Sequence, residues 1–292
     1  MNIKAWEVNV ASHIILCVNQ KVFSSKSFHI LIRNQYWSKY MTEKLKQKLK
    51  MWAVCGVLIL AACVGVSKTV TVNNTVNGKE LPIYSVETDE KKVALSFDAA
   101  WGNEDTQQIL DILKEHNIHV TFFMTGGWVE NFPDDVKKIY EAGHDLANHS
   151  ENHKNMSQLA DDECQSELLK VHEKVKELTG VEMNLFRPPY GDYDNEVILN
   201  ATACGYYSIQ WNIDSLDWKN YGVDSIIKTV TEHKDLKNGS IILMHNGAKY
   251  TAQALPKVIE GLKAKGYEIV PISELIYKEN YHLDVTGRQI QD

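Results

Sequence analysis

The sequence predicts an α/β fold in which a mostly parallel sheet, closed or nearly closed into a barrel, is covered by helices. Two observations support this. From residue 91 onward, short apolar or β-branched runs alternate with amphipathic stretches, and polar residues gather where the expected strands end. An uncharged apolar run within residues 51–67 precedes this region and predicts one N-terminal transmembrane or signal-anchor segment.

The charge along the 292-residue chain is uneven, although the net charge is only −7. Residues 1–50 are rich in Lys and Arg, and their acidic residues are Glu7 and Glu43, so the acidic excess lies in the rest of the chain. An acidic body argues against a nucleic-acid groove, and we expect no nucleic-acid partner. With 44% hydrophobic residues, the chain can bury a sizeable core.

The segment 51–67 is expected to anchor or export the chain. Lysines directly before it make residues 1–50 a basic cytoplasmic segment by the positive-inside rule, so everything after Lys68 faces outward. Three alternatives stay open: an uncleaved anchor, a cleaved signal peptide, and a lipoprotein signal, since residues 60–63 (LAAC) resemble a lipobox. Met41 would begin a more conventional signal sequence, and we expect the true start there.

The exported part is predicted to comprise a stalk, a domain and a tail. Residues 68–90 are polar and contain turn-forming Asn, Gly and Pro, which is typical of a stalk. The domain covers residues 91–277, and residues 278–292 are a C-terminal tail. Cys164 and Cys204 are too few for a disulfide scaffold, so we expect buried free thiols.

The expected elements of the domain alternate between strands and helices. β-Branched and aromatic runs predict the strands, apolar residues at helical spacing predict the helices, and Pro133 is suited to the first turn of its helix. In order, they are strand 93–97, helix 105–116, strand 119–124, helix 133–142, a strand at 146, helix 160–179, a short strand near 185, helix 194–203, strand 206–211, helix 223–233, strand 240–244, helix 252–265 and strand 267–270.

Chemistry-bearing side chains follow these strands. Residues of this kind at the carboxyl ends of parallel strands meet at one end of a barrel, where catalytic groups gather. They are Asp98, His149, Arg187, Asp214, Asp217 and His245. His149 and His153 are four residues apart and can converge on one divalent metal. The metalloprotease pattern does not fit, because Ser150 stands where its general base would be.

Five segments in order resemble the polysaccharide deacetylase family, the NodB-homology domains of carbohydrate esterase family four. They are residues 96–98 (SFD), 149–153 (HSENH), 187–191 (RPPYG), 214–218 (DSLDW) and 243–245 (LMH). The resemblance covers residues 91–276 and implies a distorted (β/α) barrel of the NodB-homology type. Residues 97–102 and the anchored layout look most like the sporulation-type, membrane-anchored subgroup.

The resemblance implies metal-assisted removal of an acetyl group from an N-acetylated sugar. It makes His149 and His153 ligands of a divalent metal, with Zn²⁺ first and Co²⁺ or Mn²⁺ as alternatives. Asp98 corresponds to the general base, and Arg187 would keep it ionised and oriented. His245 corresponds to the general acid that protonates the leaving amine.

Further positions of the motifs are implied to contact or orient the reacting groups. Asp217 would orient and charge the general acid. The backbone N–H of Tyr190 would help to hold the oxyanion, while its ring lines the sugar groove together with Trp218 and Leu243. Asp214 is expected to be structural.

The departure from the family pattern lies at Ala99, where the family usually has a second Asp that completes the metal triad. Alanine cannot ligate, so a site of two imidazoles would bind the ion more weakly. Glu104 or Asp105 lies on the same loop and is a candidate third ligand, although both also suit the start of the next helix. The aromatic Trp101 could fill the space instead.

The leading hypothesis is an exported, membrane-anchored hydrolase that de-N-acetylates cell-wall peptidoglycan, with a role in sporulation. We expect a monomer, tethered through residues 51–67 on the outer side of a bacterial cytoplasmic membrane. The alternative from another class is a catalytically silent glycan-binding domain that has lost its metal through Ala99. A third hypothesis, an esterase on O-acetylated polysaccharide, shares the same residues.

Overall fold

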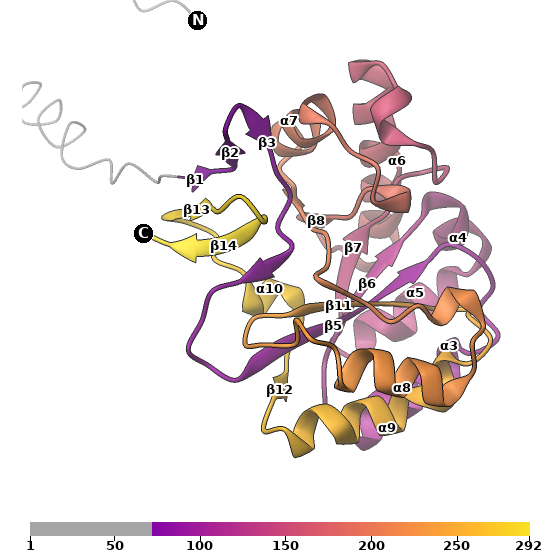
Figure 1. The fold of residues 1–292 in the computed structure, drawn as a ribbon. Coiled ribbons are helices and arrows are strands. Elements are labelled where there is room, and N and C mark those ends of the chain that lie inside the picture. The colour runs from indigo at the N-terminus through magenta and orange to yellow at the C-terminus, as the bar shows by residue number, and fades with distance from the viewer. Residues whose placement is uncertain (1–71) are drawn as a thin grey trace, which may run out of the picture. The chain divides into compact units, whose positions relative to one another are not determined.

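The structure, a computed structural model, describes residues 72–292, and a sheet of parallel strands forms its centre (Figure 1). Its strands are β5 (Lys92–Ala99), β6 (Thr121–Met124), β7 (Asp145–Asn148), β8 (Leu185–Phe186), β9 (Tyr207–Ser208), β10 (Ile213–Asp214), β11 (Ile241–His245) and β12 (Glu268–Ile269). The order is β10-β11-β5-β6-β7-β8-β9, and β12 pairs with β5. The predicted alternation of strands and helices is therefore correct in its order.

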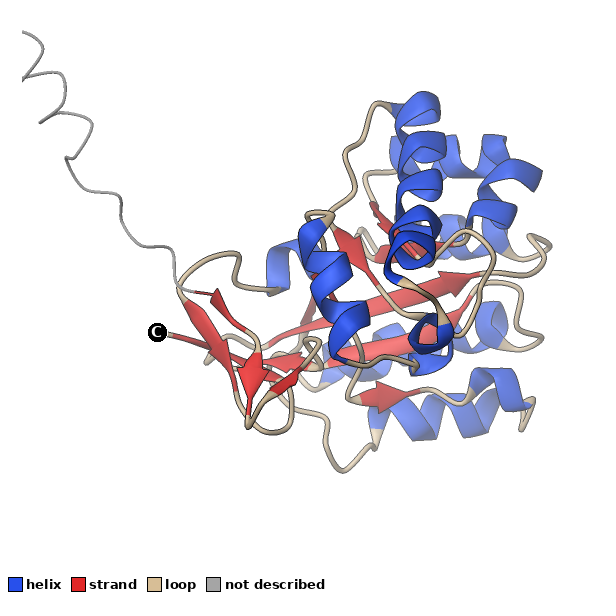
Figure 2. Cartoon of the chain, turned by 90° about the horizontal axis from the view of Figure 1, so that it is seen from above, coloured by secondary structure: helices blue, strands red, loops and turns tan. Residues whose placement is uncertain are grey.

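Helices connect the strands and lie around them (Figure 2). They are α3 (Thr106–Glu115), α4 (Gly126–Asn131), α5 (Pro133–Glu141), α6 (Asp161–Thr179), α7 (Asn195–Ala203), α8 (Val223–Thr231), α9 (Thr251–Ala264) and α10 (Ile272–Leu275), with short 3₁₀ turns at Met156–Gln158, Pro189–Gly191 and Asp217–Lys219. Helix α4 was not predicted from the sequence. Its first turn is capped by the hydroxyl of Thr125, which accepts from the Trp128 N–H at 3.2 Å.

The central strand β5 separates two apolar clusters. Its residues Val93, Leu95, Phe97 and Ala99 pack in the cluster that lies under the helices. The residues between them alternate to the inner face of the curved sheet, where Ala94 joins a second cluster. Ser96 and Asp98 share that inner face because side chains alternate along a strand. This alternation decides which residues can reach the site.

Of the two predicted forms, closed or nearly closed, the closed barrel is excluded, because β9 and β10 at the two sheet edges do not pair. The structure is an open half-barrel of parallel strands. The segment before β5 lies in the gap: the Ile83 N–H donates to the Ser208 carbonyl at 2.8 Å, and the Val86 N–H donates to the Gly239 carbonyl at 2.9 Å. The gap is therefore bridged by chain that the sequence analysis assigned to a stalk.

The predicted stalk and tail differ from the structure where residues are described. Residues 72–90 contain β1 (Val72–Asn73), β2 (Thr75–Val76), β3 (Lys79–Glu80) and β4 (Ser85–Val86), and the tail contains β13 (Tyr281–Leu283) and β14 (Arg288–Gln291). These form a sheet of order β1-β13-β14-β4 and a β2-β3 hairpin (Figure 1). Ile83, Val86 and Tyr281 are fully or almost fully buried. These strands are too short to show periodicity in sequence, which is why they were missed.

The predicted cytoplasmic segment 1–50, the start at Met41 and the anchor 51–67 lie outside the described residues and stay predictions. Among the helices of residues 72–292, none has both the length and the apolar character needed to span a bilayer. Cys164 is buried and Cys204 half-buried, and both are free thiols as predicted.

Candidate active site

The candidate acid and base lie side by side on neighbouring strands. β11 pairs with β5 in a register that sets His245 opposite Asp98, each at the carboxyl end of its strand. Both side chains line one cavity of about 410 Å³, with the residues Asp98, Ala100, Trp101, His149, His153, Tyr190, Trp211, Asp214, Trp218, Leu243 and His245. The polar residues that sequence placed after separate strands therefore meet at one end of the sheet.

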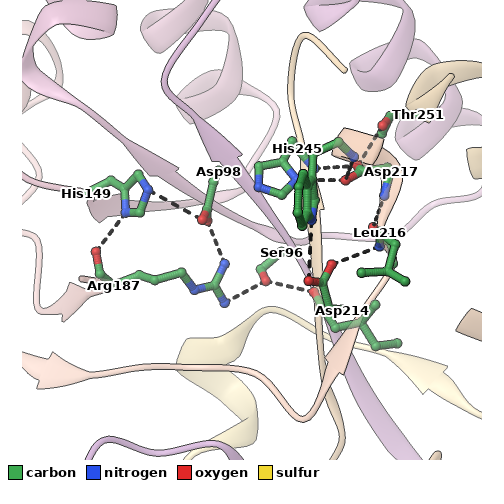
Figure 3. A network of polar contacts seen from close by, with 12 residues as sticks. Ser96, Asp98, His149, Arg187, Asp214, Leu216, Asp217, His245 and Thr251 are labelled. Atoms are coloured by element: carbon green, nitrogen blue, oxygen red, sulfur yellow. Dashed lines mark hydrogen bonds and ion pairs between the residues drawn. The ribbon is translucent and has the colours of Figure 1, made fainter. Parts of the chain in front are cut away.

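Asp98 is held as a carboxylate by a buried arginine (Figure 3). Arg187 donates from Nη1 to Asp98 Oδ1 at 2.6 Å and from Nη2 to the Ser96 hydroxyl at 2.8 Å, and its guanidinium lies 4.0 Å from the centre of the Phe123 ring. Burial raises the pKa of Asp98, but the charge and hydrogen bond of Arg187 and the charges of the nearby imidazoles together outweigh burial and leave this pKa below its ordinary value. Asp98 is thus ionised at neutral pH, as a general base must be.

A buried carboxylate, that of Asp217, favours the protonated form of His245 (Figure 3). Asp217 Oδ1 lies 2.7 Å from His245 Nδ1, and Asp217 Oδ2 accepts from the His245 backbone N–H at 2.7 Å and from the Thr251 hydroxyl at 2.7 Å. Burial lowers the pKa of His245, but the hydrogen bond and charge of Asp217 prevail, and the pKa lies above its ordinary value. The imidazole therefore favours the protonated form that a general acid requires.

The two candidate metal ligands lie on a tight loop after β7. The ring centres of His149 and His153 are 4.9 Å apart. Both Ser150 and His153 have left-handed backbone conformations, with φ of 65° and 54°, which cost a non-glycine residue free energy. Local bonds hold this backbone: the Ser150 N–H donates to Asn148 Oδ1 at 2.9 Å, and the His153 N–H donates to the Ser150 hydroxyl at 3.0 Å.

The histidine loop is also tied to α6, which the sequence analysis did not foresee. Buried Glu167 accepts from the backbone N–H and the side-chain amide of Asn152, both at 2.7 Å, and pairs with Lys154 at 3.1 Å. Lys174, two turns later on the same helix, pairs with Glu151 at 2.5 Å. Glu167 and Lys174 belong to no recognised sequence motif, so their contacts with the histidine loop could not be predicted from the sequence.

His149 fits a divalent cation by the chemistry of its free lone pair. His149 Nδ1 lies 2.7 Å from the Arg187 carbonyl, which can only accept, so Nδ1 carries the proton. His149 Nε2 is then unprotonated and faces Asp98 Oδ2 at 3.4 Å. Burial lowers the pKa of His149 to about 4, so the ring is neutral at pH 7. Two electron-rich atoms that face each other are suited to a shared cation.

The role of Glu104 or Asp105 as a third metal ligand stays a prediction. Asp105 Oδ1 accepts from the Gly247 N–H at 2.8 Å, and neither Asp105 nor Glu104 lines the cavity. Within residues 72–292, no group of three or more His, Cys, Asp and Glu side chains has the arrangement of a metal site. Ala99 is fully buried in the cluster under the helices and does not line the cavity, whereas its neighbour Ala100 does.

The predicted substrate-contacting residues line the cavity. Tyr190 adopts a left-handed backbone with φ of 61°, is 69% exposed, and its ring centre lies 4.5 Å from that of His153. Trp218 is half exposed at the cavity edge, while Leu243 is buried at its floor. The exposure of the Tyr190 side chain shows that it is not a core residue.

Trp101 and Asp214 are among the cavity residues to which sequence gave no substrate-binding role. Trp101 is half exposed, and its ring centre lies 5.3 Å from that of His245 and 6.4 Å from that of His153. Asp214, which was expected to be structural, accepts from the Leu216 N–H at 2.8 Å and also lines the cavity. The position of Trp101, an aromatic residue shortly after the end of a strand, is the sequence feature that could have indicated a substrate-binding role.

At this end of the sheet lie a general base paired with a buried arginine, a general acid paired with a buried carboxylate, and two neighbouring imidazoles. This combination defines a hydrolase-type site. The family model for polysaccharide deacetylase matches residues 85–209. Peptidoglycan-N-acetylmuramic acid deacetylase PdaA of Bacillus subtilis is 33% identical over 208 residues, 68% of this chain and 77% of that protein. A peptidoglycan-N-acetylglucosamine deacetylase of Bacillus cereus is 35% identical over 191 residues, 64% of this chain and 69% of that protein.

Among solved structures, wild-type BA3943 of Bacillus anthracis, described as a CE4 family pseudoenzyme, is similar with a TM-score of 0.65 and 33% identity over 73% of each chain. The protein described here belongs to the polysaccharide deacetylase family. The predicted family and the enzyme class of hydrolase are confirmed. The sporulation-type subgroup stays a prediction.

Proposed function

We propose that this protein removes N-acetyl groups from the amino sugars of peptidoglycan. The observation that carries the proposal is the pairing of two opposed proton-transfer groups across one cavity. Asp98 is kept ionised by Arg187, and His245 is kept protonated by Asp217. A binding module has no need of a base and an acid in their reactive forms. The relatives named as peptidoglycan deacetylases support the substrate.

The residues of the chain account for both proton transfers. Asp98 takes the proton from the attacking water, and Arg187 holds the carboxylate in place. The backbone N–H of Tyr190 would help to hold the oxyanion that forms on the acetyl carbonyl. His245 then gives its proton to the departing amine, and Asp217 stabilises the imidazolium before that step. Acetate and a free amino sugar are the products.

The residues at the site fit a divalent metal. His149 and His153 would hold the ion, whose chemistry there would be to polarise the acetyl carbonyl and to acidify water. Because these two imidazoles are the only proposed ligands, we expect weaker binding than in a site with two imidazoles and an acid. Zn²⁺ is the first candidate, and Co²⁺ and Mn²⁺ are alternatives.

The competing proposal is a catalytically silent glycan-binding domain. Ala99 and the similarity to a pseudoenzyme of the same family favour it. Retention of two contacting pairs, Asp98 with Arg187 and Asp217 with His245, favours the enzyme. An esterase that removes O-acetyl groups would use the same groups, so only the substrate test separates it.

We also propose that the domain works outside the cytoplasmic membrane, anchored through residues 51–67, as a monomer. The lysines before that segment and the cell-wall substrates of the relatives support this location. A role in sporulation is part of the same proposal.

The deciding experiment measures acetate released by the full chain, loaded with Zn²⁺, Co²⁺ or Mn²⁺, from peptidoglycan, N-acetylglucosamine oligomers and O-acetylated xylan. We expect release from peptidoglycan and a loss of about 10²- to 10⁴-fold in Asp98→Asn, which can still accept from Arg187. If the unmutated chain binds peptidoglycan but releases no acetate, the glycan-binding proposal is the better one. Release from the xylan alone would favour the esterase.

A further inference from the structure

The segment that carries Asp217 presents a cationic and aromatic surface beside the cavity. The chain from Asp214 to Gly222 contains three left-handed backbone positions, Leu216, Asn220 and Gly222, with φ of 56°, 55° and 99°. Asn and Gly adopt the left-handed conformation readily, but in Leu it persists only where surrounding contacts enforce it. The backbone of this segment is therefore held in a specific shape.

Hydrogen bonds inside the segment fix that shape. Asp214 Oδ1 accepts from the Leu216 N–H at 2.8 Å, and Asp217 Oδ1 accepts from the Trp218 N–H at 2.8 Å. Asp217 is also bound to His245 and fully buried. The residues that follow Asp217 consequently lie at a fixed position relative to the general acid.

The outward side chains of the segment combine two aromatic faces with one cation. Trp218 is 48% and Tyr221 65% exposed. Lys219 Nζ lies 4.9 Å from the centre of the Trp218 ring and 6.0 Å from that of Tyr221. Lys219 has no carboxylate partner in the part of the chain that the structure describes. A cation over aromatic rings keeps its remaining N–H donors available to a ligand.

Only Trp218 of these three lines the cavity where the acid and base meet, so Lys219 and Tyr221 continue the surface beyond it. Exposed aromatic faces offer apolar area to the C–H face of a sugar ring. A polymer with one sugar in the cavity can place the neighbouring sugar against Trp218 and Lys219. An uncharged strand would gain nothing from that cation.

We propose that Trp218, Lys219 and Tyr221 form a subsite for a sugar that carries a carboxylate, next to the sugar that is deacetylated. The inference rests on the proposed function and narrows its substrate to acidic glycans. The carboxylate comes either from the lactyl group of muramic acid or from the attached peptide. Lys219 pairs with it at the rim, where the water-exposed pair contributes modest affinity that salt weakens.

The test compares Lys219→Met with Lys249→Met in the full chain. Lys249 is a matched control, because its Nζ lies 4.9 Å from the Tyr250 ring centre but it does not line the cavity. Three substrates are used: strands freed of peptide, which carry lactyl carboxylates, strands with peptide attached, and neutral N-acetylglucosamine oligomers. Acetate release gives kcat and KM, and calorimetry gives affinity for the same three ligands.

We expect K219M to raise KM about two- to fivefold for acidic strands, with kcat and the neutral oligomers unchanged. An effect on strands freed of peptide identifies the lactyl carboxylate as the group that Lys219 binds. An effect on strands with peptide attached identifies a peptide carboxylate. High salt should remove the difference between K219M and the unmutated chain. K249M should match the unmutated chain throughout.

An equal change on acidic and neutral substrates, or the same change in K249M, overturns the proposal. If the unmutated chain releases no acetate from any substrate, the proposed function fails, and affinity alone decides the role of Lys219. In that case K219M must lose the preference for acidic strands over neutral oligomers, and an unchanged preference refutes the subsite.

Discussion

Replacement of Asp217 by Asn tests directly how the site keeps its general acid protonated. Asp217 Oδ1 receives the bonds of His245 Nδ1 and of the Trp218 N–H, and Oδ2 receives those of the His245 N–H and the Thr251 hydroxyl. An amide oxygen can keep the Oδ1 contacts, while its NH₂ group takes the place of Oδ2. The Thr251 hydroxyl can turn and accept from that NH₂.

The cost of the substitution follows from the one donor that loses its partner. The backbone N–H of His245 would face the new NH₂ of Asp217→Asn and stay unsatisfied in a buried position. An unsatisfied buried donor costs about 1–3 kcal/mol, so D217N should fold with that loss in its free energy of unfolding. The loss is a fraction of typical domain stability, and the variant should remain measurable.

The larger effect is expected on protonation of His245. Since Asp217 raises the pKa of His245 above its ordinary value of 6.5, removal of the carboxylate should move the alkaline limb of kcat/KM to lower pH. The same raised pKa contributes stability that is complete below pH 6.5 and is lost as pH rises through the folded-state value. The stability difference between the two proteins should therefore shrink at alkaline pH.

The assay is acetate release from N-acetylated oligosaccharide across pH, together with urea unfolding at several pH values. Thr251→Val is the matched control, because it removes a bond to the same carboxylate and leaves its charge in place. If D217N is active and its alkaline limb coincides with that of the unmutated chain, Asp217 does not hold the proton on His245. A shift of equal size in T251V would also refute the reasoning.

Three further results are expected. His149→Ala should abolish stoichiometric Zn²⁺ binding, measured by calorimetry; unchanged stoichiometry would remove His149 from the ligand set. Glu167→Gln should weaken Zn²⁺ affinity about 10- to 100-fold, because its carboxylate fixes Asn152 in the histidine loop, whereas the exposed Glu173→Gln on the same helix should have no effect. A reporter fused after Asp292 should be active only outside the cytoplasmic membrane, and cytoplasmic activity would refute the anchor topology.

The sequence determined the order of the elements and the end of the sheet where the site lies. Val93, Phe97 and their neighbours form a buried run, and Asp98 follows at its end, which is a local pattern along the chain. Parallel strands bring their carboxyl ends to the same edge, so Asp98, His149, Arg187 and His245 had to converge once the strands were placed. The motifs then indicated the family.

Only the tertiary structure decided which neighbours hold these residues and which residues are kept out. Ala99 points into the cluster under the helices because strand side chains alternate, and Asp105 accepts from the Gly247 N–H. Glu167 reaches the histidine loop from a helix that folds back across it. The strands at residues 72–90 and 278–292 pair with each other only after the chain has folded, since each is two to four residues long. Such contacts join residues far apart in sequence, and their energies depend on burial that no local pattern specifies.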